Sequence, residues 1–467
     1  MISICRMCNY DPFYLICRMY NYDPFYLRMR KRSLICLLFI AVLWAEGAVK
    51  APSEAIKMDE FLLRDDLWTM SKDDFTRHAT GYRFRWVSTV KDSARSTEPG
   101  TFLGEKVIEA IIRFNSNHVN EVQLSFYNRG DSGDIAEEVF TQRVDSIEGK
   151  IRDFAGKPIK DISPKESNTV ERKSRTTVWT NGVRVLRFEH AFTRVRTPTK
   201  KWSVRPEFVN LVMLKNDKNL AKYFVGDTKI DVSSMGTKKL VKKTESGDVV
   251  MDSVPMVDQG QKGYCAVATT ERVLRYYGTD VNQHELAQWA NTASGGGTDP
   301  ASLVKALKAM TTPMGLNIKI LMQYQASEFM KMVEDYNKAA KRQSLPTLQL
   351  ATKGVIDVNK LMDAMNKDLF LKIRNKSPVL VDQFMGLVKK DVNDGHPILW
   401  GVKLGFVPEQ PALPQARGGH IRLIIGYNPK TKEVLYSDSW GAGHELKRMK
   451  ASDAYAISNC LIVIEPR

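Results

Sequence analysis

The chain has 467 residues, of which 43% are hydrophobic and 26% charged, and its 69 Lys and Arg against 53 Asp and Glu give a net charge of +16. This composition excludes a disordered or fibrous protein, and the length is too great for one ordinary core, so two domains with connecting segments are expected. The basic residues are spread along the chain rather than gathered in one block, which is typical of a solvated surface. No nucleic-acid partner is therefore expected.

Residues 1–28 contain a near-perfect tandem repeat, which we interpret as an over-extended start, with Met29 as the initiator. Residues 29–47 have the three regions of a secretory signal peptide: basic residues, an apolar run from Leu34 to Trp44, and a small-residue cleavage site. The apolar run is too short to span a bilayer. We therefore expect a secreted, periplasmic or cell-envelope protein with no membrane span after the signal is removed.

Signal removal has a consequence for the cysteines. Four of the six lie within residues 1–47, and only Cys265 and Cys460 remain. Two cysteines make no disulfide framework, and Cys460 lies in an apolar run where a buried thiol is more common than a disulfide.

Residues 52–215 are predicted to form a small α+β domain. Alternating apolar residues at 122–126 predict a strand, and Asn181-Gly182 predicts a hairpin. Between them, Asp134 with Glu137 resembles a capping box. The expected inner face of this helix consists of Ile135, Val139, Val144, Ile147, Ile151 and Phe154. No catalytic constellation occurs here, and His78, His118 and His190 are interpreted as ordinary surface or strand residues.

Residues 216–250 are polar and lysine-rich, and we interpret them as a basic linker. Helices are expected from there to about residue 390, including one that begins at Asp299-Pro300 after the glycine run 295–297. That glycine run either borders a substrate cleft or is a simple connector. From Pro397 onward, strand-like runs dominate.

A candidate nucleophile lies at Cys265. Gly260 and Gly263 predict a turn that places Cys265 in the first turn of a helix, where partial positive charge favours the thiolate. Gln259 lies six positions before it.

A candidate base and a candidate orienting residue follow downstream. His420 comes after two glycines and opens an apolar strand, and Asp438 ends the next strand. Asp438 is suitably placed to hold one ring nitrogen of His420, and Trp440 to shield that bond from water.

The order Gln, Cys, His, Asp, with about 155 positions from Cys265 to His420, resembles the papain-like cysteine peptidases, and most closely their C39-like branch. Gln259 matches the oxyanion-hole spacing of that superfamily. The segment Asp438-Ser439-Trp440-Gly441 is similar to its Asn-Ser-Trp-Gly segment, with Asp replacing Asn.

The resemblance covers residues 251–467. Two positions depart from the papain type: Ala266 stands where Trp is usual, and Lys262 where a disulfide cysteine is usual. Neither change removes a catalytic group. The implied fold class is α+β, with a two-lobed papain-like domain in which a helical lobe carrying Cys265 faces a sheet lobe carrying His420.

The resemblance implies a secreted cysteine peptidase that hydrolyses peptide or protein substrates. Cys265 is the implied nucleophile, His420 the base, Asp438 its orienter and Gln259 part of the oxyanion hole, with Trp440 in support. A transglutaminase-like acyltransferase or an amidase would use the same residues. A catalytically retired papain-like binding protein is the alternative from another class, although the presence of all four side-chain types argues against it.

No cofactor or metal site is predicted. His284, His396 and His444 lack partner ligands at a suitable sequence spacing, and His396 before Pro397 is interpreted as a strand-entry residue.

Overall fold

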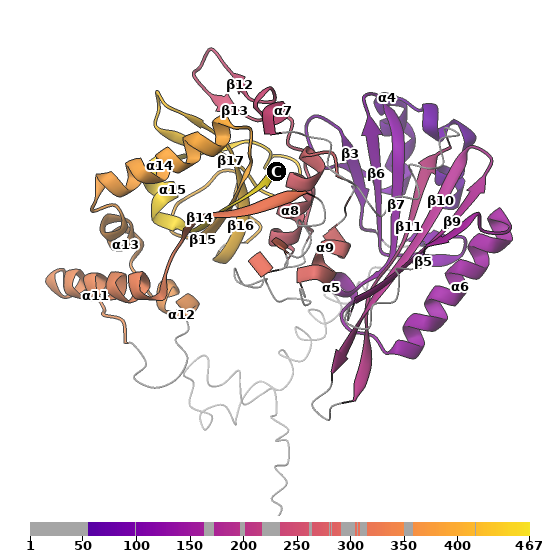
Figure 1. Cartoon of the computed structure of the whole chain (residues 1–467), viewed down its shortest axis with the longest axis horizontal. Coiled ribbons are helices and arrows are strands. Elements are labelled where there is room, and N and C mark those ends of the chain that lie inside the picture. Colours follow the sequence, from indigo (N-terminus) through magenta and orange to yellow (C-terminus); the bar gives the residue numbers. More distant parts are fainter. Residues whose placement is uncertain are drawn as a thin grey trace, which may run out of the picture. The chain divides into compact units, whose positions relative to one another are not determined.

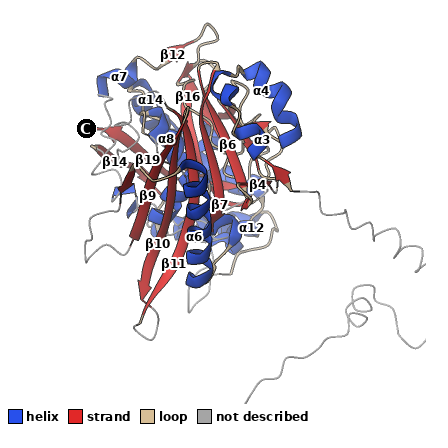
Figure 2. Ribbon diagram, turned by 90° about the vertical axis from the view of Figure 1, so that its right-hand side faces the viewer, coloured by secondary structure: helices blue, strands red, loops and turns tan. Residues whose placement is uncertain are grey.

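The computed structural model describes thirteen stretches of the chain. They are residues 55–98, 100–162, 172–196, 201–216, 234–260, 264–279, 281, 283–290, 304–305, 307–308, 315–349, 358–415 and 417–467. The tandem repeat, the signal peptide, the glycine run 295–297 and Asp299-Pro300 lie outside them. Residues Ile56–Arg467 form one compact unit. Helices and sheets are mixed along it, which confirms the α+β class (Figures 1 and 2).

The N-terminal part is built on an eight-stranded sheet in the order β2-β3-β6-β7-β11-β10-β9-β8. Its strands are β2 Arg85–Trp86, β3 Ser93–Ser96, β6 Glu109–Asn115, β7 His118–Asn128, β8 Lys160–Ile162, β9 Arg172–Asn181, β10 Arg184–Arg196 and β11 Trp202–Lys215. A small second sheet holds β1 Ile56–Lys57, β4 Gly100–Phe102 and β5 Glu105–Val107. The helices are α3 Asp59–Leu62, α4 Lys72–Ala79, α5 Arg129–Ser132 and α6 Glu137–Ala155, with 3-10 turns η1 Asp65–Thr69 and η2 Thr80–Tyr82.

The predicted hairpin is present, because Asn181 pairs with Arg184 across Gly182, whose φ is +58°. The long helix α6 packs on the sheet, but its start differs from the prediction (Figure 2). Its N-cap is Ala136 without a side-chain cap, because the Asp134 carboxylate accepts a hydrogen bond from Arg129 at 2.7 Å instead. Phe140 is buried on the inner face, whereas Val139 is 46% exposed.

The C-terminal part contains a second eight-stranded sheet. Its order is β12-β13-β16-β15-β19-β14, with β17 paired to β16 and β18 to β17. The strands are β12 Lys242–Lys243, β13 Val249–Val250, β14 Leu316–Gln323, β15 Ile398–Leu404, β16 Gly418–Asn428, β17 Glu433–Ser437, β18 Lys447–Lys450 and β19 Ser458–Pro466. The helices are α7 Ser234–Lys238, α8 Cys265–Tyr276, α9 Gln283–Ala290, α11 Ala326–Arg342, α12 Val358–Asp363, α13 Lys367–Arg374, α14 Pro378–Asn393 and α15 Ala451–Ile457.

Two predictions about this part need correction. The segment interpreted as a linker up to residue 250 includes β12 and β13, and β13 pairs with β16 through Val249 and Tyr427. Asp248 anchors this end by accepting hydrogen bonds from Arg448 at 2.9 Å and Asn428 at 2.7 Å. Residues 316–323, expected to be helical, form β14 by pairing with β19. The local sequence did not reveal this pairing because β19 lies far along the chain.

Polar contacts join the N-terminal sheet directly to the C-terminal part. Arg95 of β3 forms an ion pair with Asp258 at 3.1 Å, and Glu109 of β6 lies 3.2 Å from His284 of α9. Directly before the candidate nucleophile, Gly130 packs against the ring of Tyr264, since a Cβ at Gly130 would lie 2.3 Å from that ring. The N-terminal part therefore contacts both segments that flank Cys265.

Among the described residues, no helix has both the length and the apolar character that a bilayer crossing requires.

Candidate active site

Helix α8 begins at Cys265, as the sequence predicts. Gly260, in the turn before it, has a φ of +68°, which favours glycine. Val267 and Leu274 are buried and fix the inner face of the helix. The Thr269 hydroxyl donates to the Ile421 carbonyl at 3.2 Å, so α8 lies against β16, the strand that carries the candidate base.

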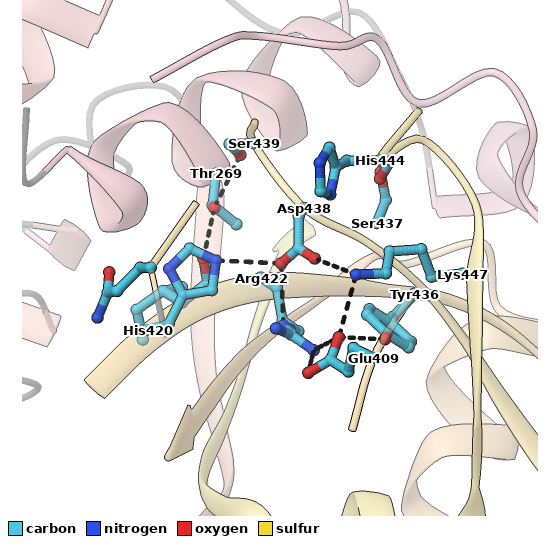
Figure 3. A network of polar contacts seen from close by, with 12 residues as sticks. Thr269, Glu409, His420, Arg422, Tyr436, Ser437, Asp438, Ser439, His444 and Lys447 are labelled. Carbon is cyan, nitrogen blue, oxygen red and sulfur yellow. Dashed lines mark hydrogen bonds and ion pairs between the residues drawn. The ribbon is translucent and has the colours of Figure 1, made fainter. Parts of the chain in front are cut away.

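His420 lies between Cys265 and Asp438. It pairs with Val402 of β15 in the antiparallel ladder and is 2% exposed. Its Nε2 is 3.0 Å from Asp438 Oδ1 (Figure 3). The Cys265 side chain lies beside the same ring, and the other ring nitrogen, Nδ1, has no hydrogen-bond partner among the described residues. The structure thus brings together the three predicted catalytic side chains.

The Cys265 and His420 side chains shift each other's titration. Burial alone would raise the pKa of Cys265, but the neighbouring imidazole of His420 lowers that pKa below its ordinary value. Burial alone would lower the pKa of His420, but Asp438 and Cys265 together raise it above its ordinary value. These directions favour a thiolate beside an imidazolium.

Trp440 covers the imidazole. Its ring stacks on that of His420 with centroids 4.1 Å apart and an interplanar angle of 6°. This contact agrees with the expected shielding of the His420–Asp438 bond.

Asp438 is fully buried among cations. Its Oδ1 lies 2.9 Å from Arg422 Nε, and its Oδ2 lies 3.5 Å from Lys447 Nζ (Figure 3). Burial raises the pKa of Asp438, but Arg422, His420 and Lys447 outweigh it and hold the pKa well below its ordinary value. Asp438 is therefore ionised throughout the neutral range.

A second carboxylate, Glu409, balances these cations. It lies 3.1 Å from both Arg422 and Lys447 and accepts a hydrogen bond from the Tyr436 hydroxyl. The Arg422 guanidinium also lies over the Tyr436 ring, 4.6 Å from its centroid. Sequence reasoning missed this network, although Arg422 gave a visible signal as the one charged residue in the otherwise apolar run 421–427.

Gln259 is buried and lies beside the Asp438 segment. Its backbone N–H donates to the Ser439 carbonyl at 2.8 Å. Its side-chain Oε1 has no hydrogen-bond partner among the described residues. Arg95 lies against the same turn, since a Cβ on Gly260 would lie 2.8 Å from its guanidinium.

Two of the remaining histidines, His284 and His396, differ from the prediction because they have acidic neighbours. His78 and His118 are exposed, and His190 is a strand residue of β10. His284 pairs with Glu109, and His396 lies beside Asp391 and Glu465, so neither lacks acidic neighbours. Sequence spacing could not reveal these partners because they come from distant elements.

Comparison with known families agrees with this geometry. The Peptidase C39 like family matches residues 251–345 and 357–461. No curated protein matches the chain. The matched residues include Cys265, His420 and Asp438, so the C-terminal half of the chain is similar to the C39-like peptidase family over the candidate site.

Proposed function

We propose that the protein is a secreted cysteine peptidase that hydrolyses peptide bonds through Cys265, His420 and Asp438. The observation that carries this proposal is the position of His420, whose Nε2 lies 3.0 Å from Asp438 and whose ring lies beside the Cys265 side chain. In the proposed reaction the Cys265 thiolate attacks the peptide carbonyl. His420 then gives a proton to the leaving amine. A water molecule that gives a proton to His420 cleaves the resulting thioester and releases the Cys265 thiolate, and Asp438 keeps the ring oriented throughout.

The oxyanion is stabilised, in this proposal, by the Gln259 side-chain amide and the backbone N–H of Cys265. The burial of Gln259 beside the Ser439 carbonyl supports this role, because a side chain fixed in place needs no reorganisation during the reaction.

The domain is proposed to have the two-lobed papain-like arrangement, with α8 in the helical lobe and β16 in the sheet lobe. The contact between Thr269 and Ile421 lies where such lobes would meet. Residues 52–215 are proposed as an α+β domain that packs on the peptidase domain, and residues 29–47 as a cleaved signal. N-terminal sequencing of the mature protein tests the signal.

Acyl transfer or amide hydrolysis by the same residues is the nearest alternative, and a catalytically retired binding protein is the alternative of another class. The mutual pKa shifts of Cys265 and His420 support a reactive thiol, which a retired site would not need to keep.

Labelling with a thiol electrophile separates the enzyme from the binding protein. We expect rapid labelling of Cys265, slow labelling of the buried Cys460, and loss of fast labelling in His420→Ala. Cleavage-site proteomics with the wild type and Cys265→Ala then distinguishes hydrolysis from acyl transfer. Equal labelling rates in wild type and His420→Ala would refute the proposal.

A further inference from the structure

Three potential metal ligands meet at one end of the C-terminal sheet. Asp391 comes from α14, His396 from the turn before β15, and Glu465 from β19. His396 Nδ1 lies 3.8 Å from Asp391 Oδ1 and 3.9 Å from Glu465 Oε2. One ligand atom from each residue falls within 4.8 Å of the other two.

Two of the three residues, Asp391 and His396, are buried and have polar atoms without hydrogen-bond partners among the described residues. Neither oxygen of Asp391 and neither ring nitrogen of His396 has a hydrogen-bond partner among the described residues. Asp391 is 1% exposed and His396 is 6% exposed. Buried polar groups are normally hydrogen-bonded because leaving one unsatisfied is costly, so these atoms are arranged for a further partner.

We propose that Asp391, His396 and Glu465 bind a divalent transition-metal ion of the zinc type. One imidazole and two carboxylates suit Zn²⁺, which bonds to such ligands at about 2.0–2.2 Å. Two ligand atoms on one tetrahedral ion are then about 3.3–3.6 Å apart. The two separations from His396 Nδ1, 3.8 and 3.9 Å, need only a small closure, and the third pair of ligand atoms lies within 4.8 Å.

Lys319 competes with the ion. Its Nζ lies 2.6 Å from Glu465 and 3.8 Å from Asp391, where it supplies the positive charge that a metal would supply. The Lys319 side chain is 40% exposed, so it is able to turn into solvent when an ion binds.

A surface pocket offers an entry route to the proposed metal site. Lys319 and Glu465 line a surface pocket of about 420 Å³, together with Asn317 and Arg467.

The proposed metal site lies far from His420. His396 precedes β15, whereas Val402, the partner of His420, lies six positions further along, about 20 Å away in an extended strand. The ion would therefore tie the α14–β15 turn to β19 and act on stability, independently of the Cys265 reaction.

Metal titration of tag-free, chelator-treated Cys265→Ala protein tests the site, because this background prevents the thiol from binding the ion. We expect saturable one-to-one binding of Zn²⁺ by calorimetry. With Zn²⁺ at 100 times Kd, we expect Tm to rise by roughly 2–5 °C. Co²⁺ should give visible absorption bands of a low-symmetry N/O site.

Variants assign the binding to these residues. Asp391→Asn and His396→Gln should each weaken Zn²⁺ binding at least about tenfold. Lys319→Met removes the competing cation and should tighten Zn²⁺ binding. This variant keeps the test informative if the other variants fold poorly. Asp394→Asn is the matched control, since Asp394 pairs with Lys238 at 3.0 Å outside the cluster. Absence of saturable binding, or binding unchanged by Asp391→Asn, would overturn the proposal.

Discussion

The indole ring of Trp440 lies flat against the imidazole of His420, with centroids 4.1 Å apart and planes 6° from parallel. A protonated imidazole over an aromatic face is stabilised by about 1 kcal/mol, which is about fivefold in an equilibrium. The stack therefore favours the charged form of His420 and restricts its rotation.

Replacing Trp440 tests this contact. We expect Trp440→Ala to lower kcat/KM about tenfold and Trp440→Phe to lower it less, because Phe keeps an aromatic face. Steady-state kinetics on a peptide substrate measure the effect, with Trp202→Ala as the control because Trp202 is 60% exposed. Full activity in Trp440→Ala would contradict the stacking argument.

Asp438→Asn tests the charge balance around the triad. In papain-type relatives Asn at this position is sufficient, but here Arg422 and Lys447 face the carboxylate and would face an uncharged amide. We expect Asp438→Asn to lower kcat/KM by about 10- to 100-fold. The double variant with Lys447→Met restores electroneutrality with Glu409 and should recover part of that loss.

Kinetics and thermal melting of both variants decide this point. Wild-type activity in Asp438→Asn would mean that orientation alone matters, and no recovery in the double variant would exclude the charge-balance explanation.

The pH dependence of kcat/KM follows from two opposite shifts. The pKa of Cys265 is lowered and that of His420 is raised, so the thiolate–imidazolium pair exists between them. Activity should rise as pH passes the lowered thiol pKa and fall as pH passes the raised imidazole pKa. In Asp438→Ala the alkaline limb should move to lower pH, because a group that raises the pKa of His420 is gone. A pH–rate profile with circular dichroism at each pH measures both limbs; an unmoved alkaline limb would contradict the assignment.

Gln259 offers a matched pair of substitutions. Gln259→Ala removes the proposed oxyanion donor and should lower kcat by about 10²- to 10³-fold with little change in KM. Gln259→Glu keeps the shape but places an acceptor at the oxyanion and should lower kcat at least as much. A change confined to KM would assign Gln259 to substrate binding instead.

Arg95 tests the contact from the N-terminal sheet. Its side chain is 9% exposed and pairs with both Glu109 and Asp258, the residue before Gln259. Arg95→Met leaves these carboxylates without their cation and should cost about 3 kcal/mol of stability and lower kcat. Lys106→Met, at an exposed position of β5, is the control. An increase in activity in Arg95→Met would instead indicate that the N-terminal part inhibits the enzyme.

Local sequence signals were enough for some features and not for others. The Gly-rich turn before Cys265 and the Asn181-Gly182 hairpin are determined by neighbouring residues, so both could be predicted. The assignment of His420 and Asp438 depended on the family resemblance. The pairing of residues 316–323 with β19, and the approach of Glu465 to His396, depend on contacts between distant segments that no local pattern encodes.

Arg422 shows the same limit at the site itself. A single charge in an apolar strand indicates a buried ion pair, but its partners, Glu409 and Asp438, lie on other segments. The sequence therefore indicated the proposed reacting groups but not the charged residues that surround them.

The place of β19 within the sheet has a consequence for biosynthesis. This strand lies between β15 and β14, although it is the last of the sheet's strands along the chain. During translation the thiol of α8 emerges long before β15 gains this neighbour, and β15 is the strand against which β16 positions His420. If the proposed peptidase activity requires the complete sheet, we expect the nascent polypeptide to carry an inactive Cys265 until the final strand inserts.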